Sequence, residues 1–239
     1  MPESFHTIIF RRITMKLRRS VVVVFLVMFQ LSVCSAFASD KVTTEKIVDS
    51  AALVVKTFGA DPDLTWFRDN VKNAKALLIV PQSLKGAFLV GGSGGSGVLI
   101  AQDSNTGEWG NPAFYTLGSI SVGLQIGAES SEVILMIMSD RGMEKLLASS
   151  FKLGADVTLA VGPVGGGTAA QTADVLSYAR SKGAFAGVSL DGAIVKTRDK
   201  RNKEYYGAEV SPTDILVRKT VSNPHADGLR KAVAELTKK

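Results

Sequence analysis

Hydrophobic positions near residue 43 recur with helical spacing. Across residues 43–58 the apolar face consists of Ile47, Ala51, Val54 or Val55, and Phe58. A second stretch, residues 64–74, repeats this spacing, which predicts two successive amphipathic helices. Residues 76–81 (ALLIVP) are short, apolar and closed by proline, and they predict a buried strand.

The pattern changes from residue 86, where glycine becomes frequent. Residues 118–128 (GSISVGLQIGA) alternate between apolar and polar, which predicts one strand with two unlike faces. Residues 133–138 predict a strand buried on both faces, and residues 141–151 predict a short helix. Further strands are predicted within 156–162, 174–180 and 184–195. A closing helix begins at Pro224 with Asn223 as its cap, and Ser211 and Asp214 form a capping-box pair before it.

The connections between the predicted strands are mostly short. Residues 103–107 (DSNTG) predict a turn, and residues 198–203 predict the tip of a hairpin. Short connections favour antiparallel pairing, because parallel strands need long crossovers. The predicted fold is therefore α+β: a curved, mostly antiparallel β-sheet or barrel-like core, with N-terminal and C-terminal helices packed on it.

The N-terminal residues have the pattern of an export signal. A basic stretch, residues 11–20 (RRITMKLRRS), precedes an apolar run, residues 21–29, and Ala36-Phe37-Ala38 supplies a small-x-small cleavage site. We expect residues 1–38 to be a signal peptide, with Met15 as an alternative start, and residues 39–239 to be a single domain. The alternative is an uncleaved membrane anchor, but the apolar run is about half of the ~20 residues that span a bilayer.

Charge and cysteine content follow from this division. The chain carries net charge +6, and residues 1–38 hold five cations and one anion, so the remainder is only +2 (23 basic minus 21 acidic residues). The basic pI of 9.4 therefore does not indicate a nucleic-acid partner. Cys34 is the single cysteine and lies within the expected signal peptide, although LSVC also resembles the start of a lipoprotein box. We expect a mature protein outside the cytoplasm, in the periplasm or cell envelope.

A glycine-rich stretch, residues 88–100 (FLVGGSGGSGVLI), contains the G-x-G-x-x-G spacing of a dinucleotide loop. That use requires a helix after the glycines, and a P-loop requires a lysine; this segment continues as a strand and has no such lysine. The alternative is that the glycines allow close backbone packing in a bent sheet. Gly94 and Gly97 are then expected to matter for folding rather than for binding.

Residues for catalysis or metal binding are scarce. His225 is the one histidine after the leader, no G-x-S-x-G surrounds a serine, and cysteine is absent after residue 38. The acids Asp191, Asp199, Glu204 and Glu209 have spacings ordinary for solvated loops. We expect no enzyme activity, metal or cofactor, and keep a hydrolase that uses His225 as a remote alternative.

Two features remain as candidate contacts with a membrane. The basic cluster in residues 196–203 holds Lys196, Arg198, Lys200, Arg201 and Lys203, and such charges attract anionic headgroups. A solvated loop is the alternative. Trp109, beside a turn, is either an interfacial anchor or half-buried core.

Several ordered motifs resemble the SYLF domain family. They are Gly86-Ala87-Phe88, GGSGGSGVLIA, GEWGNPAF and GLQIGAE, followed by Leu176-Ser177-Tyr178, residues 183–190 and Tyr205-Tyr206-Gly207. The resemblance covers about residues 45–217, with Gly110 in place of a usual serine. The matching motif positions are Gly92, Gly94, Gly97, Trp109, Pro112, Gln125, Gly127, Gly187, Tyr206 and Gly207.

The resemblance implies lipid binding, through basic surface and an N-terminal amphipathic helix. Here that helix is residues 43–58, with Lys46 and Lys56. We expect an exported, non-enzymatic protein that contacts anionic phospholipid at a membrane surface. The alternative is a structural or protein-interaction component of the cell envelope with an envelope protein partner. Because an exported protein meets no actin, the actin binding of eukaryotic relatives is not expected to carry over.

Overall fold

The computed structural model describes residues 43–87, 90–122, 127–163, 172–181, 184–185 and 190–238. Within Thr43–Lys239 these residues form one compact unit. The expectations about the leader and Cys34, and the motif positions Gln125 and Gly187, lie outside the described residues. Gly127 is described through its backbone, as the first residue of a strand.

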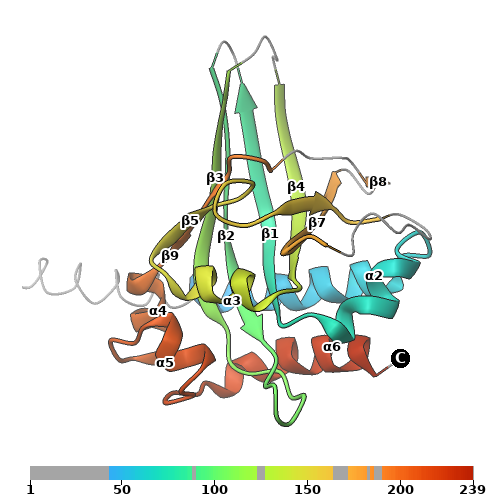
Figure 1. Ribbon diagram of the computed structural model, residues 1–239. Coiled ribbons are helices and arrows are strands. Elements are labelled where there is room, and N and C mark those ends of the chain that lie inside the picture. Colours follow the sequence, from blue (N-terminus) through green and yellow to red (C-terminus); the bar gives the residue numbers. More distant parts are fainter. Residues whose placement is uncertain are drawn as a thin grey trace, which may run out of the picture. The chain divides into compact units, whose positions relative to one another are not determined.

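Helices at both ends of this unit cover one face of a sheet (Figure 1). The first helix spans residues 43–60, and its apolar face, including Val48, Val55 and Phe58, is buried. The second predicted helix is divided into α2 (Thr65–Asn70) and the 3₁₀ turn η1 (Val71–Asn73). The closing helix α6 (Asp227–Thr237) follows the 3₁₀ turn η2 (Pro224–Ala226), where Asn223 is the cap as predicted.

Four long strands form the centre of the sheet; the first two pair with each other, whereas the third and fourth do not. β1 (Ala76–Ala87) pairs with β2 (Val90–Ala101), and β3 (Ala113–Val122) is followed by β4 (Gly127–Ile137). The other strands are β5 (Ser150–Lys152), β6 (Leu159–Val161), β7 (Val175–Ser181), β8 (Ala184–Phe185) and β9 (Ile194–Thr197). Among the described residues the order is β5-β9-β3-β2-β1-β4-β7-β6, and β8 pairs with β7.

Pairing in this sheet is antiparallel except between β6 and β7, which run parallel. The sheet curls into a half-barrel, with the helices on it, so the predicted α+β class and antiparallel topology are confirmed. The second face is covered by α3 (Asp140–Leu147) and α5 (Pro212–Leu216), whose buried residues pack in the same cluster as Phe151 of the edge strand β5. The Ser211–Asp214 capping box at the start of α5 is present as predicted.

Two strand predictions need correction. Residues 118–128 do not form one strand, because β3 ends at Val122 and β4 begins at Gly127. The alternation continued across this junction because the residues on both sides of it belong to strands, whose side chains alternate between two faces, so the pattern carried no signal of the break. Residues 184–195 likewise divide between β8 and β9, which begins only at Ile194.

Candidate binding groove

The basic cluster of residues 196–203 lies at the end of a strand and in the first turns of the helix that follows. The predicted hairpin tip is therefore wrong. β9 ends at Thr197, and α4 spans Asp199–Tyr206. Asp199 favours the helix start through its charge in the first turn, and Gly207 ends the helix in the left-handed conformation, at φ 72°. The sequence prediction was wrong here because five cations hid the apolar spacing of the helix.

Two buried side chains hold α4 against the sheet. The Asn202 carboxamide oxygen accepts a hydrogen bond of 2.8 Å from the backbone N–H of Phe114 on β3. The Tyr205 ring meets the Phe114 ring edge-on, with centroids 5.2 Å apart. These anchors turn the opposite side of α4, with Lys200 and Lys203, toward solvent.

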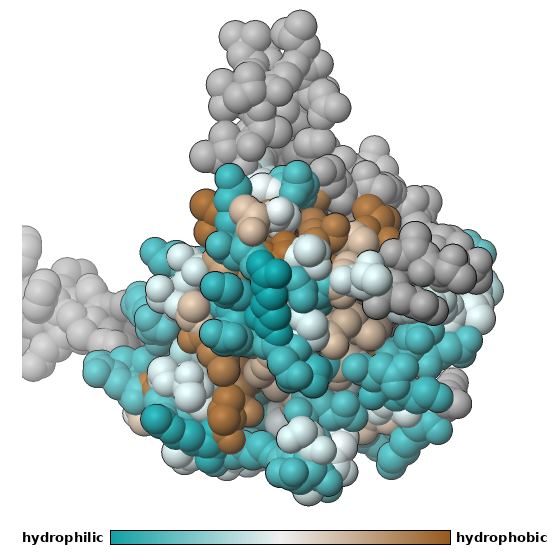
Figure 2. Space-filling model, viewed as in Figure 1, coloured by the Kyte–Doolittle hydropathy of each residue, from teal (hydrophilic) through white to brown (hydrophobic). Residues whose placement is uncertain are grey.

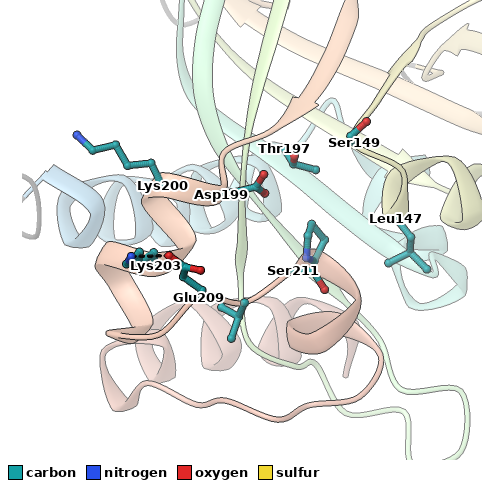
Figure 3. A pocket seen from close by; sticks show the side chains of 10 residues that line it. Leu147, Ser149, Thr197, Asp199, Lys200, Lys203, Glu209 and Ser211 are labelled. Carbon is teal, nitrogen blue, oxygen red and sulfur yellow. Dashed lines mark hydrogen bonds and ion pairs between the residues drawn. The ribbon is translucent and has the colours of Figure 1, made fainter.

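A groove of about 630 Å³ opens between α4, the start of α5 and the end of α3 (Figure 3). Leu147, Val210 and Pro212 give it an apolar floor. Hydroxyls of Ser149, Thr197 and Ser211 lie around this floor, and Lys200 and Lys203 lie along the α4 side. In Figure 2 hydrophobic atoms are exposed in a strip between α3 and α5, with hydrophilic atoms on both sides. The groove therefore combines an apolar surface with cations at one rim.

Carboxylates moderate the positive charge at this rim. Lys203 Nζ lies 2.6 Å from Glu209 Oε1, and Lys200 Nζ lies 3.4 Å from Glu204 Oε1. The hydrogen bond from Lys203 lowers the pKa of Glu209, so this carboxylate stays charged well into acid. Residues 196–209 carry five cations and three acids, a net charge of +2. The arrangement can hold an anionic amphiphile, with its apolar part on the floor and its charge at Lys203.

Only part of the predicted basic set meets at this groove. Lys200 and Lys203 line it; Lys196 is exposed on β9, Arg198 is exposed just before α4, and Arg201 is half-buried. Lys46 and Lys56 lie on the exposed side of helix 43–60, ten residues apart, which is about 15 Å along a helix. The apolar face of this helix is already used by the core, so in this fold the helix presents mainly polar side chains outward.

The motif residues near Trp109 have structural contacts. The Tyr206 hydroxyl donates a hydrogen bond of 2.6 Å to the carbonyl oxygen of Pro112, which joins the end of α4 to the start of β3. Gly207, next to Tyr206, provides the left-handed cap of α4. Trp109 is 5% exposed, so it packs in the core and is not an interfacial anchor.

The glycines of β2 fall into two groups. Side chains at Gly95 and Gly97 would overlap the backbone of β1 and Val80, at the point where β1 bulges between Ile79 and Gln82. A Cβ atom at Gly94 or Gly92 would instead have its nearest neighbour at 3.6 Å, an ordinary contact. Close packing therefore explains Gly97 but does not explain Gly94.

Catalytic and metal-binding arrangements are lacking in the part of the chain that the structure describes. No group of three potential metal ligands occurs among these residues. The ring nitrogens of His225 lie 3.3 Å from Asp49 Oδ1 and 3.4 Å from the Tyr205 hydroxyl, so neither contact supplies a serine nucleophile. Within the same residues, no helix has the length and apolarity needed to cross a bilayer.

Sequence reasoning did not identify the apolar floor of the groove. Leu147 closes α3, while Val210 and Pro212 flank the start of α5, so the floor comes from segments more than sixty residues apart. The signal that pointed to the place was the lysine pair of residues 200 and 203. Nothing in the local sequence indicated which apolar residues would lie beside that pair.

The described residues thus form a mostly antiparallel α+β half-barrel with a groove beside α4. The family model of Ysc84, described as "Las17-binding protein actin regulator", matches residues 118–236. The chain belongs to this family, the SYLF domain family, as its motifs suggested.

Individual relatives agree with the family match. SH3 domain-containing YSC84-like protein 1 from Homo sapiens is 33% identical over 175 residues, 71% of this chain and 51% of that protein. Protein YSC84 from Saccharomyces cerevisiae is 30% identical over 199 residues, 80% of this chain and 42% of that protein. LAS seventeen-binding protein 3 from the same species is 29% identical over the same length. The chain spans about half the length, or less, of these relatives.

These matches correct one expectation about partners. The family description names an actin regulator, and a relative is named for binding LAS seventeen. The expectation that actin-related binding does not carry over is therefore wrong. It rested on the apolar leader, residues 21–29, and not on any feature of the folded domain.

Proposed function

We propose that this chain is a non-catalytic binding domain that contacts anionic phospholipid through the groove between α3, α4 and α5. The observation that carries the proposal is the pairing of an apolar floor with the Lys200 and Lys203 rim. A volume of about 630 Å³ falls within the range of small-molecule sites. Apolar contact supplies binding free energy, and the lysines select a negative headgroup.

Lys203 is the residue that changes partner on binding. In the free protein it is held by Glu209 at 2.6 Å, an exposed pair. Exposed pairs of this kind contribute only about 0–1 kcal/mol, so a phosphate oxygen can replace Glu209 at small cost. Since the local net charge is modest, binding weakens as salt is raised but does not vanish.

The test is co-sedimentation of the proposed mature chain, residues 39–239, with phosphatidylcholine vesicles, with and without phosphatidylglycerol, because the basic leader would itself bind anionic vesicles. We expect binding only to the vesicles with phosphatidylglycerol, and its loss in Lys200→Glu/Lys203→Glu. The matched control is Lys72→Glu/Lys231→Glu, which changes the charge equally at two exposed lysines that line another groove. Equal binding by both double variants would overturn the proposal.

A second candidate function is binding to a protein of the actin machinery. The family description and the name of the yeast relative favour it. Co-sedimentation with actin filaments separates the two functions, because filament binding that persists in Lys200→Glu/Lys203→Glu is independent of the lipid groove. Binding to filaments and to no vesicle would favour this second function.

We also propose that the mature chain is exported and begins at Ser39. The basic stretch, the apolar run and Ala36-Phe37-Ala38 support it. Intact mass of the chain purified from its host tests the proposal, since cleavage after Ala38 removes the first 38 residues and acylation of Cys34 adds mass. A mass that includes Cys34 without acylation would contradict export by this route.

A further inference from the structure

One half of a sheet face has no covering element among the described residues. Helix 43–60 crosses the lower part of this face, and β1 to β4 extend well beyond it (Figure 1). Beyond the helix, Leu84, Gly94, Gly118 and Ile194 lie directly opposite one another on β1, β2, β3 and β9. Opposite residues of antiparallel strands share a face. We call this row the open sheet face.

The open sheet face continues the face that helix 43–60 covers. On β2, Gly94 and Ser96 face the same side of the sheet as Val98, because every second residue of a strand shares a face. Val98 is buried in the cluster that contains Val54 and Phe58 of the helix. Along β3, Gly118 and Thr116 lead to Phe114 in the same cluster. The sheet thus presents one half of this face to a helix of its own chain, whereas Gly94, Ser96 and Gly118 on the other half are half-buried and have no covering element among the described residues.

Apolar side chains border the open sheet face. Leu84 is 56% exposed and Ile194 is 52% exposed, at opposite ends of the row. Leu53, on the side of helix 43–60 nearest the strands, is 64% exposed. A groove of about 470 Å³ lies between this helix and the strands, lined by Ser50, Leu53, Gln82 and Ser130 among others. Of the three strongly exposed apolar residues, Leu53 lines this groove, while Leu84 and Ile194 lie at the two ends of the row on the strands.

The middle of the open sheet face is flat because it holds two glycines, Gly94 and Gly118, which the backbone does not require. A Cβ atom at Gly94 would have its nearest neighbour at 3.6 Å, and one at Gly118 would have it at 3.8 Å. Neither glycine has a positive φ among the residues described, so ordinary side chains fit the backbone at both positions. Strands disfavour glycine. The missing side chains leave space above the sheet, which indicates an occupant there.

We propose that the open sheet face binds an amphipathic α-helix of a partner protein, with acidic residues at the end that lies over β9. The row from Leu84 to Ile194 spans three strand spacings, about 14 Å, which equals between two and three helical turns. The partner helix lies beside helix 43–60, with apolar residues on Leu84, Ile194 and Leu53. The glycine floor allows its backbone to approach the sheet closely.

Charge determines the direction of the partner helix. Lys196 and Lys152 are exposed on the face of Ile194, at the β9 and β5 end of the row. At the opposite end, Arg180 is already paired with Glu132 through two bonds of 2.7 and 3.1 Å. The positive end is complementary to acidic side chains. A flat membrane fits the site less well, because helix 43–60 projects beside the floor and keeps a planar surface away from it.

The experiment screens a displayed library of amphipathic helical peptides, which differ in where their charges lie, for binding to the full-length chain in solution. The enriched peptides are then synthesised and measured by fluorescence anisotropy. We expect them to carry acids at one end, and Leu84→Asp or Gly94→Leu to weaken their binding about tenfold or more. Val217→Asp is the matched control, since Val217 is 53% exposed on another surface. Its affinity should stay within about twofold of wild type.

Circular dichroism and urea unfolding establish that each variant is folded. Failure to enrich any helix, or equal binding by the wild type, Leu84→Asp and Gly94→Leu, would overturn the proposal. A dimer in size-exclusion chromatography that these variants disrupt would assign the face to a second copy instead. Loss of vesicle binding in these variants would assign it to a membrane, whereas the lipid groove is tested separately through Lys200 and Lys203.

Discussion

Gly97 on β2 lies against the carbonyl oxygen of Ile79 on β1 so closely that a Cβ atom could not fit between them. The contact occurs at the bulge in β1, where Val80 also presses on Gly97. We expect Gly97→Ala to destabilise the fold by roughly 1–3 kcal/mol, the cost of forcing backbone shifts in a packed interior. Urea unfolding, followed by circular dichroism, measures the difference.

Gly94→Ala is the matched control, three residues away on the same strand. Its added methyl group would lie 3.6 Å from its nearest neighbour, the carbonyl oxygen of Leu117. Because alanine loses less backbone entropy than glycine, we expect unchanged or slightly raised stability, by about 0.5–1 kcal/mol at most. Equal destabilisation by Gly97→Ala and Gly94→Ala would show that the bulge is not what requires glycine.

Tyr206 and Pro112 define a second testable contact. Tyr206→Phe removes the 2.6 Å hydrogen bond and leaves the Pro112 carbonyl oxygen without that donor. We expect a loss of about 1 kcal/mol in the free energy of unfolding. Tyr205→Phe serves as a comparison, since the Tyr205 hydroxyl has only a 3.4 Å contact with His225. A larger effect of Tyr205→Phe would contradict the assignment of Tyr206 as the link between α4 and β3.

Asp103 makes the stability depend on pH in the acid range. The side-chain hydrogen bond from Lys219 and the backbone N–H groups of Asn105 and Thr106 lower the pKa of Asp103 to about 2. In the unfolded chain a carboxyl of this type titrates near pH 4, so the unfolded state binds the proton first as the pH falls. The contribution of Asp103 is therefore complete above about pH 4 and is lost between about pH 4 and pH 2.

Unfolding by urea at a series of pH values tests this contribution. We expect Asp103→Asn to be less stable than wild type at neutral pH and to lose less stability on acidification. Asp214, whose pKa is lowered to about 2, chiefly by the Ser211 hydroxyl, contributes in the same pH window. Parallel pH profiles for the wild type and Asp103→Asn would contradict the role given to Lys219.

The sequence predicted the elements better than their junctions. Apolar spacing located the first helix, predicted for residues 43–58, and the strand of residues 133–138, and residue type located the capping box of Ser211 and Asp214. Each of these depends on local chemistry. It missed the break between the end of β3 at Val122 and the start of β4 at Gly127, because alternation persists on both sides. It also missed α4, whose buried Asn202 and Tyr205 are separated by charged residues.

The candidate site was predictable only in part, for a similar reason. Lys200 and Lys203 form a recognisable basic run, but the Glu209 partner and the Leu147 floor depend on tertiary packing. Conversely, glycines of one sequence motif perform different tasks. Gly97 is needed by the bulge in β1, which the sequence does not mark, whereas a Cβ atom at Gly94 would make only an ordinary contact at 3.6 Å.

The pairing of Lys203 with Glu209 predicts a gain of lipid binding. Glu209→Gln keeps the shape of the side chain but removes the charge that holds Lys203 at 2.6 Å. The local net charge rises by one, and Lys203 becomes available to a headgroup. We expect affinity for vesicles with phosphatidylglycerol to rise about 1.4-fold to fivefold, which corresponds to the 0.2–1 kcal/mol of an exposed pair. The control is Glu235→Gln, which makes the same charge change 4.0 Å from Lys231 on α6. Equal gains from Glu209→Gln and Glu235→Gln would mean that only the overall charge matters, and that Lys203 has no special position in the groove.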